Sequence, residues 1–184
     1  WRCREGGFFS PGARKIFGLF VWAGCAKAKV GYAIQALLNE VGVLVRHLPS
    51  ARTVQHAIKE GGEFGLIQLG YKMSQAASFG LSTDGTSHRG ITTEGTHVTV
   101  KSSSYGDNDD ITTPTNHKWV TRVFGVEKAL NHTATEQHCS LLNNLNHIDT
   151  SYLGSPLAKR LNDHLTFNRL FQKLNFQSGD HAAD

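Results

Sequence analysis

The ten residues FGLSTDGTSH, numbered 79 to 88, decide the fold class of this chain. Residues 79–83 form a short strand candidate that reaches an acid at Asp84. Asp is a poor strand former, and the small residues around it leave room for a metal ion or a phosphate. A carboxylate held at a strand end is therefore a candidate metal ligand. The alternative is an Asp84-Gly85 turn that closes a hairpin.

Two further strand candidates follow along the chain. Residues 96–101 alternate and place Val98 and Val100 on one face, and residues 119–124 form the third candidate. The polar residues 102–117 contain several turn formers and predict a loop between the second and third strands. Three strands in sequence predict a sheet in the middle of the chain.

Helical patterns precede this sheet. Ser10-Pro11 predicts a helix start, because Pro is favoured in the first turn of a helix. A second apolar pattern at helical spacing follows Gly31, and Ser50 can cap a third helix. We expect Gly61-Gly62 to interrupt or end that third helix, since glycine is a weak helix former.

Helical patterns return after the sheet. Thr133 and Glu136 have the spacing of a capping box, and Ser155-Pro156 predicts the start of a last helix whose apolar residues extend to Leu174. A short segment around residues 175–177 follows. This order predicts an α/β or α+β fold, with an N-terminal helical cluster and a mixed sheet of about three to four strands flanked by helices.

The charge is unevenly distributed between the two predicted regions. Residues 1–60 carry nine Lys/Arg and three Asp/Glu, a net +6, whereas residues 61–184 carry ten and twelve, a net −2. We expect residues 1–77 to form a basic region similar to a helix-turn-helix and to contact phosphates. A helical bundle that only packs on the rest of the chain is the alternative. The candidate phosphate contacts are Lys27, Lys29, Arg46, Arg52 and Arg89.

Composition narrows the class of protein further. The 184 residues hold three Cys without the spacing of a disulfide framework, and their longest apolar stretch, 16–26, is too short to span a bilayer. We therefore expect an intracellular protein, with a nuclear location compatible with its charge and no membrane partner. The sequence has neither a phosphate-binding GxxxxGK[ST] loop nor a GxSxG elbow, which disfavours nucleotide and serine hydrolases.

Several motifs resemble an abundant family of fungal proteins derived from mobile elements, found in many copies in mushroom-forming fungi. The motifs are PSARTV at 49–54, EGG at 60–62, QLGY at 68–71, STDGTSHR at 82–89, HV at 97–98 and GDHAAD at 179–184. The chain departs from that family at 93–97, where TEGTH stands in place of an aromatic residue followed by Glu-Ser-Arg-His. Family members continue past the last motif, so we expect residues 78–184 to be incomplete at the C-terminus.

The region 78–184 also resembles the ribonuclease-H-like core of DNA transposases. That resemblance implies three antiparallel strands, a first metal-binding Asp on the first strand, and a second near the end of a fourth strand. Asp84 and Asp180 are the corresponding residues, and His88 would assist them. The resemblance implies Mg²⁺ as the cofactor and a nuclease or strand-transfer activity. It also implies nucleic acid as the partner, with DNA favoured over RNA. A third carboxylate would fall beyond residue 184.

Other interpretations stay open at this point. The chain could be a non-catalytic nucleic-acid or protein interaction module in which Asp84 is only a turn residue. It could also be a secreted fungal defence protein, a ribonuclease or a carbohydrate binder, with a glycan at Asn131. His88 and His97 could meet across the predicted hairpin. Histidines around residues 132–147 lack the spacing of a zinc site, and the acidic run 107–110 lacks that of a calcium loop.

Overall fold

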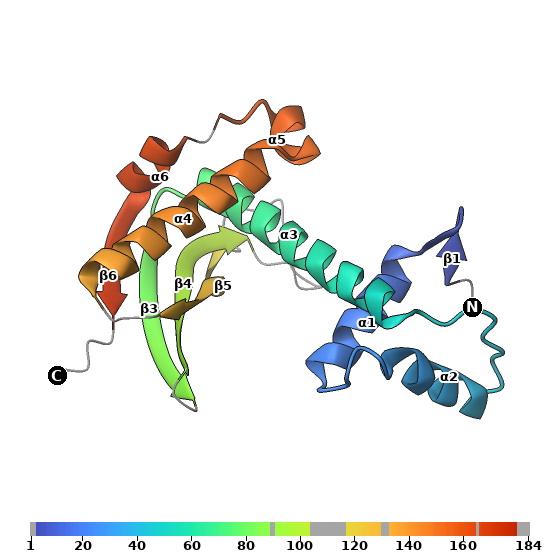
Figure 1. Ribbon diagram of the computed structural model, residues 1–184. Helices are drawn as coiled ribbons and strands as arrows, with labels where there is room; N and C mark the ends of the chain where they lie inside the picture. The colour runs from blue at the N-terminus through green and yellow to red at the C-terminus, as the bar shows by residue number, and fades with distance from the viewer. Residues whose placement is uncertain (1–2, 89–90, 104–116, 130–132, 165, 180–184) are drawn as a thin grey trace. The chain divides into compact units, whose positions relative to one another are not determined.

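A computed structural model describes residues 3–88, 91–103, 117–129, 133–164 and 166–179. The fold is mixed α/β, as the sequence predicts, and Figure 1 shows its helices and strands in chain order. The chain divides into two compact units, residues 1–65 and 66–184. This division falls before the predicted boundary at residue 77. Arg89, Asp180, Asn131 and the acidic run 107–110 lie outside the described residues.

The first unit is a small helical cluster. It contains strands β1 (Arg4–Glu5) and β2 (Phe8–Phe9), helices α1 (Pro11–Trp22) and α2 (Val30–Glu40), and the first part of α3 (Ala51–Gln75). The helix start predicted at Ser10-Pro11 and the cap predicted at Ser50 are confirmed. Ser10 Oγ accepts from the backbone N–H of Ala13 at 3.3 Å, and Ser50 Oγ from that of Thr53 at 3.2 Å. The core of this unit consists of Phe9, Ala13, Phe17, Val30, Ile34 and Val54.

Helix α3 is continuous over 25 residues, so the predicted break at Gly61-Gly62 is wrong. Each glycine costs the helix up to about 1 kcal/mol relative to Ala. Burial at both ends of the helix offsets that cost, because Val54 lies in the core of the first unit and Leu69 and Met73 lie in that of the second.

Two glycines of α3 give opposite stability predictions. A Cβ added at Gly62 meets nothing within 4 Å, whereas one added at Gly70 would lie 2.6 Å from Cβ of Tyr152. We expect Gly62→Ala to raise the free energy of unfolding by about 0.5–1 kcal/mol. We expect Gly70→Ala to lower it by about 1–3 kcal/mol through overpacking. Urea denaturation of both variants measures this, and equal changes in both would contradict the helix packing described here.

The second unit is built on a four-stranded sheet. Its strands are β3 (Phe79–His88), β4 (Ile91–Ser103), β5 (His117–Ala129) and β6 (Leu174–Gly179), in the order β5-β4-β3-β6. Strand β4 is antiparallel to β3 and β5, whereas β6 runs parallel to β3. Asp84 is paired with Gly95 inside this ladder, and the pairing continues to His88 and Ile91. The predicted turn at Asp84-Gly85 is therefore wrong, because pairing on the β4 side extends β3 through both residues.

One face of the sheet packs against helices. Directly paired residues of neighbouring strands point to the same side, so Leu81 and Val98 share a face with Phe79 and Val100. All four are buried. They form the core of this unit together with Leu69, Met73, Ala76, Phe124, Leu141, Leu145, Ile148, Tyr152, Ala158 and Leu170.

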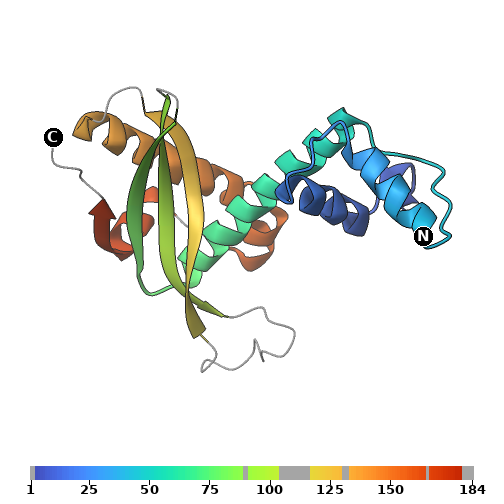
Figure 2. The same ribbon diagram turned by 90° about the horizontal axis from the view of Figure 1, so that it is seen from below.

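The opposite side of the sheet, which we call the open face, is not covered by any described helix. Figure 2 looks onto it, with α4, α6 and the second part of α3 behind the strands. By the pairing register its described residues include Gly80, Ser82 and Asp84 of β3, Gly95, His97, Thr99 and Lys101 of β4, Trp119, Thr121, Val123 and Val126 of β5, and Phe176 of β6.

Three helices complete the second unit: α4 (Ala134–Leu153), α5 (Pro156–Leu161) and α6 (Phe167–Lys173). The caps predicted at Thr133 and Ser155 are confirmed, since their hydroxyls accept from the backbone N–H of Glu136 and of Ala158. The predicted single last helix is two helices. Asn162 has a φ of 51°, a left-handed conformation that ends α5, and Thr166 caps α6.

Candidate functional site

Asp84 lies in the middle of the open face with an exposed side chain. It is paired with Gly95, which has no side chain, and its neighbours on β3 include Ser82 and Thr86. Pairing with β4 holds the backbone of Asp84 in the strand, and its carboxylate is accessible. Oxygen donors of this kind suit Mg²⁺.

The predicted meeting of His88 and His97 does not occur. His88 is paired with Ile91 at the end of the hairpin, whereas His97 is paired with Ser82. The ring of His97 instead leans over Gly95, since its Cε1 is 3.5 Å from the place of a Cβ on that glycine. His97 therefore lies beside Asp84 on the open face.

The second predicted metal ligand, Asp180, lies outside the described residues. The strand that leads to it is β6, which ends at Gly179 paired with Thr83. Within the described ranges, no three His, Cys, Asp or Glu side chains gather closely enough to hold a metal ion. Asp84 is therefore the one predicted metal ligand that the described residues include.

The predicted phosphate contacts of the first unit are exposed, and two of them lie by the start of α3. Lys27 donates a hydrogen bond to Gln55 of α3, and Arg52 donates to His56 at 3.4 Å. Lys29 lies 5.8 Å from the ring centre of Tyr32, in a cation–π contact. Arg46 is exposed in the segment before α3.

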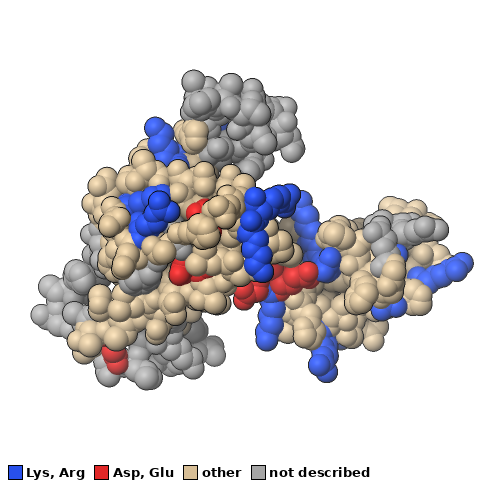
Figure 3. All heavy atoms as spheres, turned by 90° about the horizontal axis from the view of Figure 1, so that it is seen from above, with Lys and Arg blue, Asp and Glu red and all other residues tan. Residues whose placement is uncertain are grey.

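Two further residues lie on the same face of α3 and are not among the predicted contacts. His56 and Lys59 follow Arg52 by four and seven residues, the helical spacing that puts side chains on one face, and both are exposed. In the view of Figure 3, Lys and Arg side chains are distributed over a largely uncharged surface.

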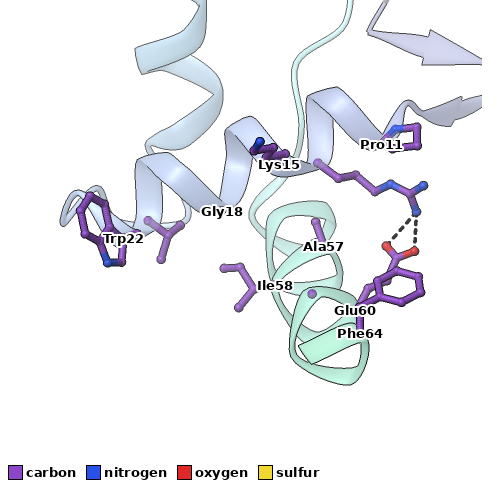
Figure 4. Close-up of a pocket in the computed structure, with 11 residues that line it drawn as sticks. Pro11, Lys15, Gly18, Trp22, Ala57, Ile58, Glu60 and Phe64 are labelled. Carbon is purple, nitrogen blue, oxygen red and sulfur yellow. Dashed lines mark hydrogen bonds and ion pairs between the residues drawn. The ribbon is translucent and has the colours of Figure 1, made fainter. Parts of the chain in front are cut away.

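An apolar hollow of about 560 Å³ lies within the first unit, between α1 and the first part of α3. Figure 4 shows Trp22 at one end and Phe64 at the other, beside the ion pair of Arg14 and Glu60. The two N–O distances of that pair are 2.6 and 2.7 Å. Gly18 and Gly61 leave the hollow open, because a Cβ at either would meet nothing within 4 Å. The hollow could hold an apolar side chain, and no sequence motif pointed to it.

In the second unit, several side chains with shifted pKa values form a polar network behind the sheet. The hydroxyl of Tyr152 donates to Oδ2 of Asp163 at 2.7 Å, and burial raises the pKa of Tyr152 to about 12. Burial alone would raise the pKa of Asp163 too, but hydrogen bonds from Ser74 and Tyr152 and the nearby cations Lys173 and Arg169 hold it below its usual value. The residues with these shifted pKa values thus belong to a set of contacts that joins helices of the second unit.

Lys173 extends this network to the end of α3. Its Nζ donates to the carbonyl oxygens of Ser74 at 2.5 Å and of Met73 at 3.4 Å, which otherwise lie in the last turn of that helix. Burial lowers the pKa of Lys173. A lysine at a helix C-terminus interacts favourably with the helix dipole. None of these groups lies on the open face, so the network is a structural one.

Asp149 of α4 is a half-buried acid. One of its carboxylate oxygens has no hydrogen-bond partner within the described part of the chain, and burial raises the pKa of this group. Its neighbours in sequence at 145, 148 and 152 all belong to the core, so it lies at the margin of the helix face that packs on the sheet.

Comparison with known proteins gives no match: no protein-family model, curated protein or solved structure resembles the chain closely enough to be counted. Among the described helices, none is both long enough and apolar enough to cross a membrane.

Proposed function

We propose that this protein is a mobile-element-derived nucleic-acid-binding protein that keeps the remnant of a metal-dependent nuclease or strand-transfer site at Asp84 and Asp180. The first unit contacts phosphates through its basic residues, and the second carries the metal site on its sheet. The proposal also assigns residues 78–184 a ribonuclease-H-like ancestry.

The observation that carries the proposal is the parallel pairing of β3 with β6. The ladder ends with Thr83 opposite Gly179, so Asp84 and Asp180 each come one residue after a paired position. In parallel strands, residues at matching positions point to the same side of the sheet. On this proposal, Asp84 and Asp180 are the next matching positions of the register. Three consecutive antiparallel strands, with a fourth strand after the helices, also agree with what the transposase resemblance implies.

The two carboxylates would hold Mg²⁺ through their oxygens. When bound, the ion supplies an activated water or hydroxyl and stabilises the leaving oxygen in phosphoryl transfer. Asp84 contributes an exposed carboxylate on a paired strand. His97, beside it over Gly95, is placed to orient groups that approach the same side of the sheet. DNA is the favoured nucleic acid because the motifs resemble proteins of DNA mobile elements.

Mn²⁺ binding tests this proposal without requiring activity. We expect Asp84→Asn and Asp180→Asn each to weaken Mn²⁺ binding by at least about 10-fold, because each removes a charged ligand. Isothermal titration calorimetry measures the affinity, and Mg²⁺-dependent cleavage of DNA is followed in parallel.

Glu94→Gln is the matched control for the metal experiment. Glu94 is paired with Gly85, one residue from Asp84, but it points to the packed face and is buried. It should bind Mn²⁺ as the wild type does. If the two Asp variants keep wild-type affinity for Mn²⁺, the proposed metal site is wrong.

A further inference from the structure

Two aromatic side chains mark opposite edges of the open face. Trp119 on β5 keeps 60% of its surface exposed, and Phe176 on β6 keeps 49%. The ring of Phe176 lies against the backbone of β3, since a Cβ added at Gly80 would overlap three of its ring atoms. The inner side of the ring is thus in contact with the strand, and its outer side faces away from the sheet.

The centre of the open face is polar. Ser82, His97 and Thr99 occupy its two central strands, and the hydroxyls of Thr99 and Thr121 are 2.9 Å apart. The exposed aliphatic residues, Val123 and Val126, lie on the edge strand β5. A helix that packs on a sheet buries an apolar stripe against its middle. A polar centre with aromatic edges instead suits a ligand that has both flat rings and hydrogen-bonding groups.

A basic residue accompanies the larger aromatic ring. Lys101 is paired directly with Trp119, and both line a hollow of about 350 Å³ together with His117 and residues 75–78. Bases of single strands stack on exposed aromatic rings, while neighbouring cations contact the phosphates. Duplex bases are already stacked on one another, so such rings distinguish single strands from duplexes.

We propose that the open face binds single-stranded nucleic acid, with one base stacked on Trp119, another on Phe176, and a phosphate at Lys101. The inference rests on the proposed function, because it states which form of nucleic acid passes Asp84. Lys101 and Gly95, the partner of Asp84, are six residues apart on β4, about 20 Å. A nucleic-acid strand whose first bound base stacks on Trp119 therefore reaches Asp84 after several nucleotides.

Stacking, rather than charge, supplies this affinity. Lys101 and Asp84, both on the described part of the open face, have opposite charges, so together they contribute no net charge. Binding at this face therefore depends weakly on salt, in contrast to phosphate contacts by the first unit. This difference separates the two surfaces by experiment.

The test uses the full chain, a short labelled oligothymidylate and a duplex of the same length, with affinity measured by fluorescence anisotropy. We expect Trp119→Ala to weaken oligothymidylate binding by about 5- to 150-fold, with the salt slope and the duplex affinity unchanged. Trp119→Phe keeps a ring and should stay within about 3-fold of the wild type. The control is Trp22→Ala, an exposed tryptophan of the first unit, which should have no effect.

Three results overturn the inference: Trp119→Ala binds oligothymidylate as the wild type does, Trp119→Phe loses as much as Trp119→Ala, or the duplex loses as much affinity as the single strand. A dimer that dissociates only in Trp119→Ala, with no oligothymidylate binding by the wild type, would assign the face to a second copy instead. If Asp84→Asn still weakens Mn²⁺ binding in any of these cases, only the single-strand inference fails. Wild-type Mn²⁺ affinity in Asp84→Asn counts against the proposed function itself.

Discussion

Tyr152→Ala lowers the free energy of unfolding by about 3–5 kcal/mol, the usual cost of removing a large aromatic side chain from a core. Tyr152 has no exposed surface and contacts Gly70 of α3 closely, with its Cβ 2.6 Å from the place of a Cβ on that glycine. The residue thus fixes the spacing of α3 and α4. Its loss opens a cavity that neither helix can fill by a small shift.

Tyr152→Phe separates the hydroxyl from the ring. The hydrogen bond to Asp163 is lost while the ring is kept, so we expect a decrease of about 1–2 kcal/mol, because the acceptor is charged but half-buried. The pKa of Asp163 is lowered in the folded protein. Its contribution to stability is therefore fully present above the ordinary pKa of 3.8 and is lost as the pH falls through the lower folded value. The difference between wild type and Tyr152→Phe should shrink over that acidic range.

Chemical denaturation at several pH values measures both variants. Tyr32→Phe is the control, since Tyr32 is exposed on α2 and its substitution should change stability by less than about 0.5 kcal/mol. A Tyr152→Phe difference that stays constant from neutral pH to well below pH 3.8 would contradict the assigned hydrogen bond.

Removal of four positive charges from the first unit weakens duplex binding in a salt-dependent way. Each phosphate neutralised adds about 0.9 to the slope of log affinity against log salt, so the quadruple Gln variant should lose up to about 3.6 of that slope. Between 50 and 200 mM salt, this amounts to a difference of up to about 150-fold. The substituted residues are Lys27, Lys29, Arg46 and Arg52.

The matched control removes charges elsewhere. Lys159 and Arg160 are exposed on α5, far along the chain from the helical cluster, and Lys159→Gln with Arg160→Gln should leave the slope unchanged. A loss of slope in this double variant of about half that of the quadruple variant would show that binding follows net charge alone. Folding of the quadruple variant is checked by its unchanged melting temperature, because all four side chains are exposed.

Local signals were the part of the fold that the sequence predicted well. Ser10, Ser50, Thr133 and Ser155 cap helices as expected, because an N-cap depends on residues within one turn. The three consecutive strands were also located, although each is longer than its pattern. Pairing extends strands beyond their strongest residues, which is why Asp84 lies in a strand despite its weak propensity.

The features of the fold that could not be predicted from the sequence depend on non-local contacts. The pairing of β6 with β3 joins distant parts of the chain, and no local pattern reports it. A bulge between Thr96 and His97 places Phe124 as an extra residue on β5, which shifts the alternation of that strand. The side on which Trp119 or Val126 lies therefore could not be read from alternation alone. The helical spacing of Arg52, His56 and Lys59, by contrast, is a local pattern that the sequence contains.

The position of β3 between β4 and β6 has a consequence during synthesis. Until Leu174–Gly179 leaves the ribosome, the β6 side of β3 is an unpaired edge with free backbone donors and acceptors. Such an edge can pair with the same strand of another nascent chain. Polysomes that translate this protein thus hold several copies with an unpaired strand edge at once. Chaperones that shield extended segments would matter most between the completion of β3 and the emergence of β6.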